Sequence, residues 1–255
     1  MSLLQRFRLV LMVLPVVGVV AAIKLAVHFF HLEFLNLDGL FPTLVAGAIF
    51  LIGFLLSHTL SDYKEAERIV GDMRVALETL YADVAAFGQS KPGFDSAPMR
   101  VFVTEFIDAF EHGLAQEHAH AALGAAITKA DDLLAMFVML EDAGMSDRYV
   151  VRLRGAHDVL RRSLYRIAYM QKMQFVPSVH VMVQSLVVAS LVLMLFLKTT
   201  AIAEGALIIG FVGYMLVYAI ILIEQLEKPF RTGEATVDDV SIFLLRDFEA
   251  KVKAG

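Results

Sequence analysis

The feature that most constrains this chain is residues 40–84, which begin as an apolar segment and continue as a charged helix. Residues 44–56 contain only aliphatic residues, alanine, glycine and two phenylalanines, Phe50 and Phe54. Charged residues follow from position 62, and neither proline nor glycine separates the two halves. A helix of roughly 40 residues reaches about 60 Å, about twice the thickness of a bilayer core. We therefore expect one helix that crosses a membrane and continues into the cytosol.

The composition supports a membrane protein. Hydrophobic residues make up 58% of the 255 residues, and the net charge of −5 gives no sign of nucleic-acid binding. The chain has no cysteine, which excludes disulfides, thiolate metal sites and cysteine nucleophiles. The first apolar stretch does not end in a small-x-small cleavage site, so we interpret it as a retained span and not as a signal peptide.

We expect an all-α membrane protein with four transmembrane helices and a large helical cytosolic domain. The expected spans are residues 9–30, 40–60, 176–197 and 205–223. The expected divisions are membrane helices 1 and 2 in 1–60, a cytosolic helical domain in 61–175, membrane helices 3 and 4 in 176–223, and a cytosolic tail in 224–255.

The basic residues predict the orientation. Thirteen Lys and Arg residues lie between the second and third spans, whereas the two short links on the other side carry only Lys198. The positive-inside rule then places both termini and the central region in the cytoplasm. We expect the protein in the inner, or plasma, membrane of a bacterium.

The central region has helical periodicity. Apolar residues recur at three- and four-residue steps through residues 62–87, and a loop with two prolines and a glycine follows in 89–98. A second helical stretch runs through 99–140, with a possible break at Gly113 or at Gly124. A third, basic helix is expected over 146–173.

Few residues suggest site chemistry. Lys24, inside the first span, either reaches a headgroup or the helix bundle or lines an ion path. His112, Glu117, His118 and His120 form a histidine-rich segment. His118 and His120 are two residues apart and diverge on a helix, so a surface or subunit-contact patch is the favoured interpretation and a metal site the alternative.

No motif indicates catalysis, and we expect neither an enzyme nor a cofactor. The chain lacks HExxH, a glycine-rich phosphate loop and GxSxG. The acidic pairs Asp131-Asp132 and Asp238-Asp239 are interpreted as helix starts, where negative charge suits the helix dipole.

Three stretches resemble the bestrophins, a family of oligomeric ion channels. Gly53-Phe54, with Phe50 one turn earlier, resembles the apolar neck of the second membrane helix. Residues 176–180 (VPSVH) resemble Val-Pro-x-Val-Tyr, and residues 224–230 (EQLEKPF) resemble Glu-Gln-Leu-x-x-Pro-Phe. The order and spacing of these stretches agree over roughly residues 9–240. Residues 231–235 (RTGEA) replace the acidic run that helps animal members to bind calcium, so the resemblance does not extend to calcium activation.

The resemblance implies a homo-oligomer, expected to be a pentamer, in a lipid bilayer. Ala46, Phe50 and Phe54 would form rings that narrow the pore as a hydrophobic gate. His58 and Asp62 would follow at the pore exit, where His58 adds pH-dependent positive charge and Asp62 adds negative charge.

A second, cytosolic aperture is placed from spacing alone at Val150 or Val151. Phenyl edges tolerate anions, and we expect chloride as the permeant inorganic ion. A cation-selective channel of the same architecture remains an alternative. A non-conducting scaffold that binds a cytosolic partner is another alternative, and a transporter is a third.

Overall fold

The computed structural model describes residues 7–36, 40–115, 119–172, 177–199, 201–230 and 239–254. Its helices are α2 (Arg8–Phe29), α3 (Leu40–Ser90), α4 (Ala97–Leu114), α5 (Ala119–Asp142), α6 (Asp147–Lys172), α7 (Pro177–Leu195), α8 (Ile202–Ile208), η1 (Ile209–Gly213), α9 (Tyr214–Leu226) and α10 (Phe243–Ala254). The described residues contain no strand, only an isolated bridge between Leu35 and Leu197. The all-α fold predicted from the sequence is confirmed.

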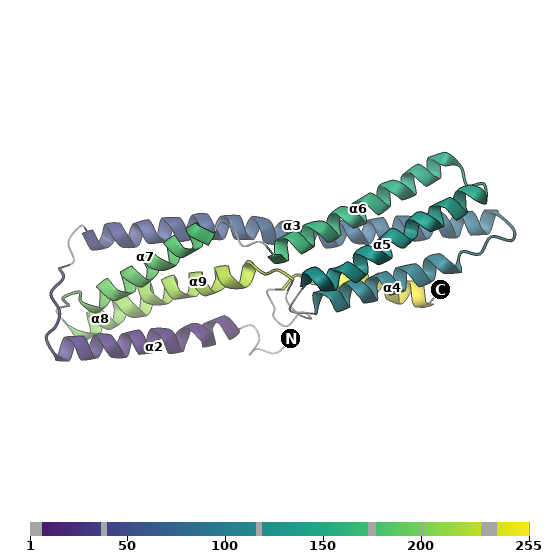
Figure 1. Cartoon of the computed structure of the whole chain (residues 1–255). Helices are drawn as coiled ribbons and strands as arrows, with labels where there is room; N and C mark the ends of the chain where they lie inside the picture. Colours follow the sequence, from purple (N-terminus) through teal and green to yellow (C-terminus); the bar gives the residue numbers. More distant parts are fainter. Residues whose placement is uncertain are drawn as a thin grey trace. The chain divides into compact units, whose positions relative to one another are not determined.

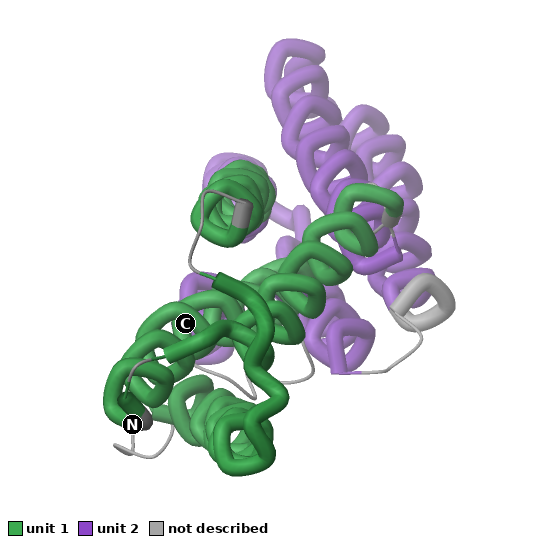
Figure 2. Tube along the Cα trace, turned by 90° about the vertical axis from the view of Figure 1, so that its left-hand side faces the viewer, with its two compact units in different colours: residues 1–62, 174–227 green, residues 63–173, 228–255 purple. Residues whose placement is uncertain are grey.

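The chain divides into two compact units, coloured in Figure 2. We call residues 1–62 with 174–227 the membrane unit, and residues 63–173 with 228–255 the bundle unit. Helix α3 is continuous over 51 residues and contributes to both units, as the uninterrupted sequence predicts. Its end at Ser90 is followed by a turn in which Gly93 adopts a φ of 89°, a conformation that favours glycine.

Four helices among the described residues are long and apolar enough to cross a membrane, so the chain is an integral membrane protein. They comprise α2, the apolar part of α3, α7, and the continuous run of α8, η1 and α9. Helix η1 is a five-residue π-helical turn inside the fourth span. Helices α2, α7 and α9 contact one another (Figure 1).

Two apolar clusters hold the membrane unit together. Ala48, Ile52 and Leu55 of α3 pack with residues of α7 and α9. Val13 and Val17 of α2 pack with residues of α7, η1 and α9. Each helix therefore turns one side inward and leaves the other to whatever surrounds the subunit.

The bundle unit has a conventional buried core. Helix α5 packs against α4 and α6, and Phe106, Phe110 and Phe137 are fully buried. Helix α10 packs against α4, and the Arg74 guanidinium lies 3.9 Å from the centroid of the Phe248 ring. The sequence indicated a helix start at Asp238-Asp239 but gave no bounds for a helix in this tail. Asp238 lies outside the described residues, and α10 begins at Phe243.

Two expectations about helix boundaries are settled by the structure. The break in the stretch 99–140 falls at Gly113, since α4 ends at Leu114, whereas Gly124 lies inside α5. The prediction that Asp131 and Asp132 start a helix is wrong, because both lie in the middle of α5. The packing of the core face of α5 outweighs the preference of paired carboxylates for the start of a helix. Asp131 instead pairs with Arg161 at 3.3 Å.

Candidate functional site

The predicted neck residues share the outward face of α3. Phe50 is 74% exposed and Phe54 59% exposed, and Ala46 is exposed as well. Ile52 and Leu55, on the other side of the helix, are buried in the membrane unit. Phe50 and Phe54 therefore point away from their own subunit, toward lipid, water or another copy.

The centre of this face is made of small and hydroxyl-bearing side chains around Phe50 and Phe54. At 100° per residue, the exposed positions from Thr43 to Ser61 other than Ile49 and Leu60 fall within an arc of about 120°. These positions are Thr43, Ala46, Gly47, Phe50, Gly53, Phe54, Ser57 and Ser61. We call them the α3 outward face. Large aliphatic residues, Ile49 and Leu60, occur only at its margin.

The predicted pore exit lies beside this face. His58 Nε2 is 3.7 Å from Asp62 Oδ2, and both side chains are partly exposed. Helical geometry turns His58 about 80° and Asp62 about 120° from Phe50. The structure thus pairs the two residues with each other, and the exposed positions of this stretch are Ser57, Leu60 and Ser61.

The two candidates for the cytosolic aperture differ in burial. Val150 is 2% exposed and belongs to the core of the bundle unit, whereas Val151 is 68% exposed. Of the pair, only Val151 presents its side chain at the surface of α6.

Lys24 is buried and held by several acceptors. Its Nζ donates to Glu33 Oε1 at 2.6 Å and to the carbonyl oxygens of Leu195 and Leu197. Burial raises the pKa of Glu33, but hydrogen bonds from Lys24, His28 and the Thr199 amide outweigh it and lower that pKa to about 2. Lys24 therefore points into the bundle, where it ties α2 to the segments around Glu33 and Leu197.

Two of the stretches that carry the bestrophin resemblance meet in the membrane unit. His180, near the start of α7, places Nδ1 3.2 Å from Glu227 Oε1 at the end of α9. Gln184 Nε2 lies 2.9 Å from His180 Nε2 and donates to Glu224 Oε1 at 3.1 Å. The sequence alone did not predict that His180 lies beside two carboxylates, those of Glu224 and Glu227.

The histidine-rich segment is only partly described. His112 is exposed on α4, while Glu117 and His118 lie outside the described residues, as does the His120 side chain. Within the described part of the chain, no group of three His, Asp or Glu residues is arranged to hold a metal ion.

The fold is similar to solved structures of a bacterial bestrophin homologue from Klebsiella pneumoniae. One single-residue variant of that homologue is 18% identical to this chain, with a TM-score of 0.70 and coverage of 98% of this chain and 99% of the other. A second variant is 16% identical, with a TM-score of 0.72 and coverage of 96% and 98%. A zinc-phased structure is 19% identical, with a TM-score of 0.69 and 97% of both chains covered. No protein-family model and no curated protein matches the chain.

Proposed function

We propose, from the premise that this chain has the bestrophin fold, that its copies form a ring around an ion pathway through a membrane. The ring is a homopentamer, and each copy turns the α3 outward face toward the shared axis. The permeant ion is a small inorganic anion, with chloride as the first candidate.

One observation carries the proposal, namely the composition of the α3 outward face. Lipid chains favour large aliphatic side chains on the helix surfaces that they contact. Here the centre of the exposed face consists of alanine, glycine, serine and threonine around the rings of Phe50 and Phe54. Small and hydroxyl-bearing residues suit a surface that meets water or a neighbouring helix at close range.

Phe50 and Phe54 give this pathway its narrow part. A ring of phenyl groups binds hydrated ions poorly, so a slight change in width switches it between a dry and a wet state. Aromatic edges carry partial positive charge, so rings that present their edges tolerate anions better than rings that present their faces.

The charges that follow on α3 favour anions. Lys64 lies 14 residues after Phe50, which returns it to within about 40° of the same side of the helix, and it is exposed. Asp62 lies about 120° away from Phe50 and next to His58. Because the Asp62 side chain is still 43% exposed, a cation-selective pathway of the same architecture is the second candidate.

The basic residues support an orientation with both termini in the cytoplasm. This orientation makes the bundle unit cytosolic and places His180 and Glu227 at the cytosolic end of the membrane unit. The host membrane that we propose is a bacterial inner membrane.

The test combines oligomeric mass in detergent with currents in planar bilayers. We expect a pentameric mass, and we expect Phe50→Ala and Phe54→Ala to raise single-channel conductance because each removes a ring of phenyl groups. The matched control is Phe211→Ala in η1, since Phe211 is 73% exposed, almost as much as Phe50. A monomeric or dimeric protein, or equal conductance in all variants, would contradict the proposal.

A further inference from the structure

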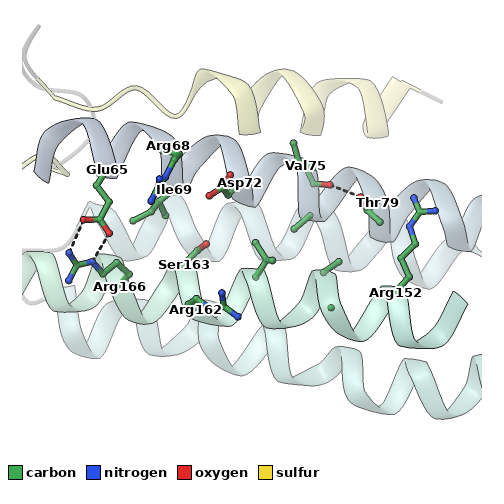
Figure 3. A pocket seen from close by; sticks show the side chains of 14 residues that line it. Glu65, Arg68, Ile69, Asp72, Val75, Thr79, Arg152, Arg162, Ser163 and Arg166 are labelled. Carbon is green, nitrogen blue, oxygen red and sulfur yellow. Dashed lines mark hydrogen bonds and ion pairs between the residues drawn. The ribbon is translucent and has the colours of Figure 1, made fainter. Parts of the chain in front are cut away.

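A groove runs along the bundle unit between α3 and α6 (Figure 3). Its volume is about 660 Å³, within the range of about 300–1,000 Å³ that holds small organic ligands. Its charged lining residues are Glu65, Arg68, Asp72, Arg152, Arg162 and Arg166. The four arginines outnumber the two carboxylates, so the groove is electropositive.

Two of these arginines are already engaged. Arg166 holds Glu65 through two hydrogen bonds, Nε to Oε1 at 2.9 Å and Nη2 to Oε2 at 2.8 Å. Arg152 Nε lies 3.2 Å from Asp83 Oδ2. These pairs join α3 to α6 along the groove. The positive charge that they do not neutralise comes from the remaining arginines, Arg68 and Arg162.

The other two are available to a ligand. Among the described residues, neither Arg68 nor Arg162 makes a side-chain hydrogen bond or a close ion pair, and both are exposed. The hydrogen bonds from Arg166 lower the pKa of the Glu65 carboxyl, and the Arg68 charge adds to this effect. Figure 3 shows them on opposite walls, Arg68 on α3 and Arg162 on α6, toward the same end of the groove. Asp72 lies near the same end of the groove (Figure 3), and its negative charge repels an anion. An anionic ligand therefore needs contacts with both guanidinium groups to overcome this repulsion.

The part of the groove beside this basic end is apolar and open. Val75 of α3 is 64% exposed, and Val159 faces the same groove from α6. A side chain added at Gly155 would meet open space. The groove thus offers an apolar surface next to two guanidinium groups.

We propose that this groove binds a phosphorylated small molecule, with its phosphoryl group between Arg68 and Arg162 and its organic body over Val75, Val159 and Gly155. Guanidinium forks match phosphate oxygens, and a phosphoryl group has enough oxygens to accept from two arginines at once. The site is separate from the neck residues, and binding is measured without any ion current.

The experiment uses the full-length protein in detergent and isothermal titration with adenosine monophosphate, adenosine and inorganic phosphate. Adenosine monophosphate should bind saturably and more tightly than adenosine. Arg68→Gln and Arg162→Gln should each weaken it by about tenfold or more, the usual effect of losing a charge-assisted hydrogen bond. The matched control is Arg148→Gln, on the exposed surface of α6 outside the groove.

A second variant tests the apolar part. Gly155→Leu fills the open space and improves helix propensity, so it should weaken adenosine monophosphate binding at least tenfold while inorganic phosphate still binds. If a glutamine variant loses the wild-type oligomeric mass, Arg68→Lys and Arg162→Lys replace it; each keeps the charge, lacks the fork and should still weaken binding.

Three results would overturn the proposal. The first is no saturable binding of adenosine monophosphate to the wild-type protein. The second is an equal loss of affinity in Arg148→Gln, which would indicate general electrostatic attraction. The third is a cross-linking or imaging result that shows a neighbouring copy of the chain filling the groove.

Discussion

Helices α2 and α3 both leave one side exposed in the membrane unit, but the two exposed surfaces have different compositions. Every exposed residue of α2 between positions 9 and 27 is apolar, and the large ones include Leu11, Leu14, Val19 and Leu25. The α3 outward face instead places small and hydroxyl-bearing residues around Phe50. The α2 surface suits lipid chains, whereas the α3 surface suits water or another helix.

This contrast depends on which side of α2 is turned inward. Its buried residues form a narrow stripe that contains Lys24, 4% exposed, together with Val13 and Val17. Because a charged side chain in a membrane helix needs a partner, the acceptors of Lys24 fix the rotation of α2. Hydropathy alone predicted the membrane spans, but it did not predict which side of α2 or of α3 is buried.

The largest effect is expected from Glu33→Gln, which removes the partner that fixes α2. Breaking a buried ion pair leaves an uncompensated charge and costs about 3–5 kcal/mol of stability. Thermal unfolding in detergent measures the loss. The matched control is Glu78→Gln, because Glu78 pairs with Arg74 at 2.6 Å but is 57% exposed, and exposed pairs contribute about 0–1 kcal/mol.

The same variant has a defined pH dependence. The pKa of Glu33 falls from an ordinary 4.5 to about 2 in the folded protein. The folded state then binds fewer protons than the unfolded state between these values, so the contribution of the pair is complete above pH 4.5 and disappears as the pH falls toward 2. The stability difference between wild type and Glu33→Gln should shrink over this interval; a constant difference would contradict the assigned pairing.

The next effect compares the two outward faces directly. Val19→Lys puts a charge on the α2 surface near the middle of the span, where insertion costs about 2.5–3.5 kcal/mol. Phe50→Lys puts the same charge on the α3 outward face at a similar depth, where water would solvate it if this face lines the proposed pathway. We expect a sharp loss of folded, membrane-inserted protein for Val19→Lys and a much smaller loss for Phe50→Lys. Equal losses would mean that both faces meet lipid.

Much of the fold could be predicted because the sequence patterns that indicate its helices lie within single segments of the chain. The run without proline or glycine from Phe54 through Arg68 predicted the continuous α3, and the glycine at 113 marked the end of α4. The bounds of α10 were not predicted, although Leu245, Phe248 and Val252 follow one another at three- and four-residue steps and are buried. The charged residues around these three positions hid the periodicity in a short segment.

The site was less predictable because it depends on distant pairings. Arg166 and Glu65 are 101 residues apart in the chain, and no sequence pattern joins them or indicates the groove beside them. The exposure of Phe50 and Phe54 also depends on packing by α7 and α9 on the opposite side of α3. Asp62 was expected at the pore exit because it lies one turn below His58. The rotation of the helix between Phe50 and Asp62, however, turns Asp62 about 120° away from the side that carries Phe50.

The smallest effect separates Lys64 from Asp62 as determinants of ion sign. Lys64 is exposed on the side of α3 that carries Phe50, so Lys64→Gln should move the reversal potential in a salt gradient toward cation permeability. Asp62→Asn should move it less, because Asp62 lies off that face and next to His58. The Lys64 shift should grow at low salt, since the Debye length rises from about 8 Å at 0.15 M to about 30 Å at 0.01 M. If Asp62→Asn gives the larger shift, α3 is rotated relative to the axis, and the cation-selective alternative is then favoured.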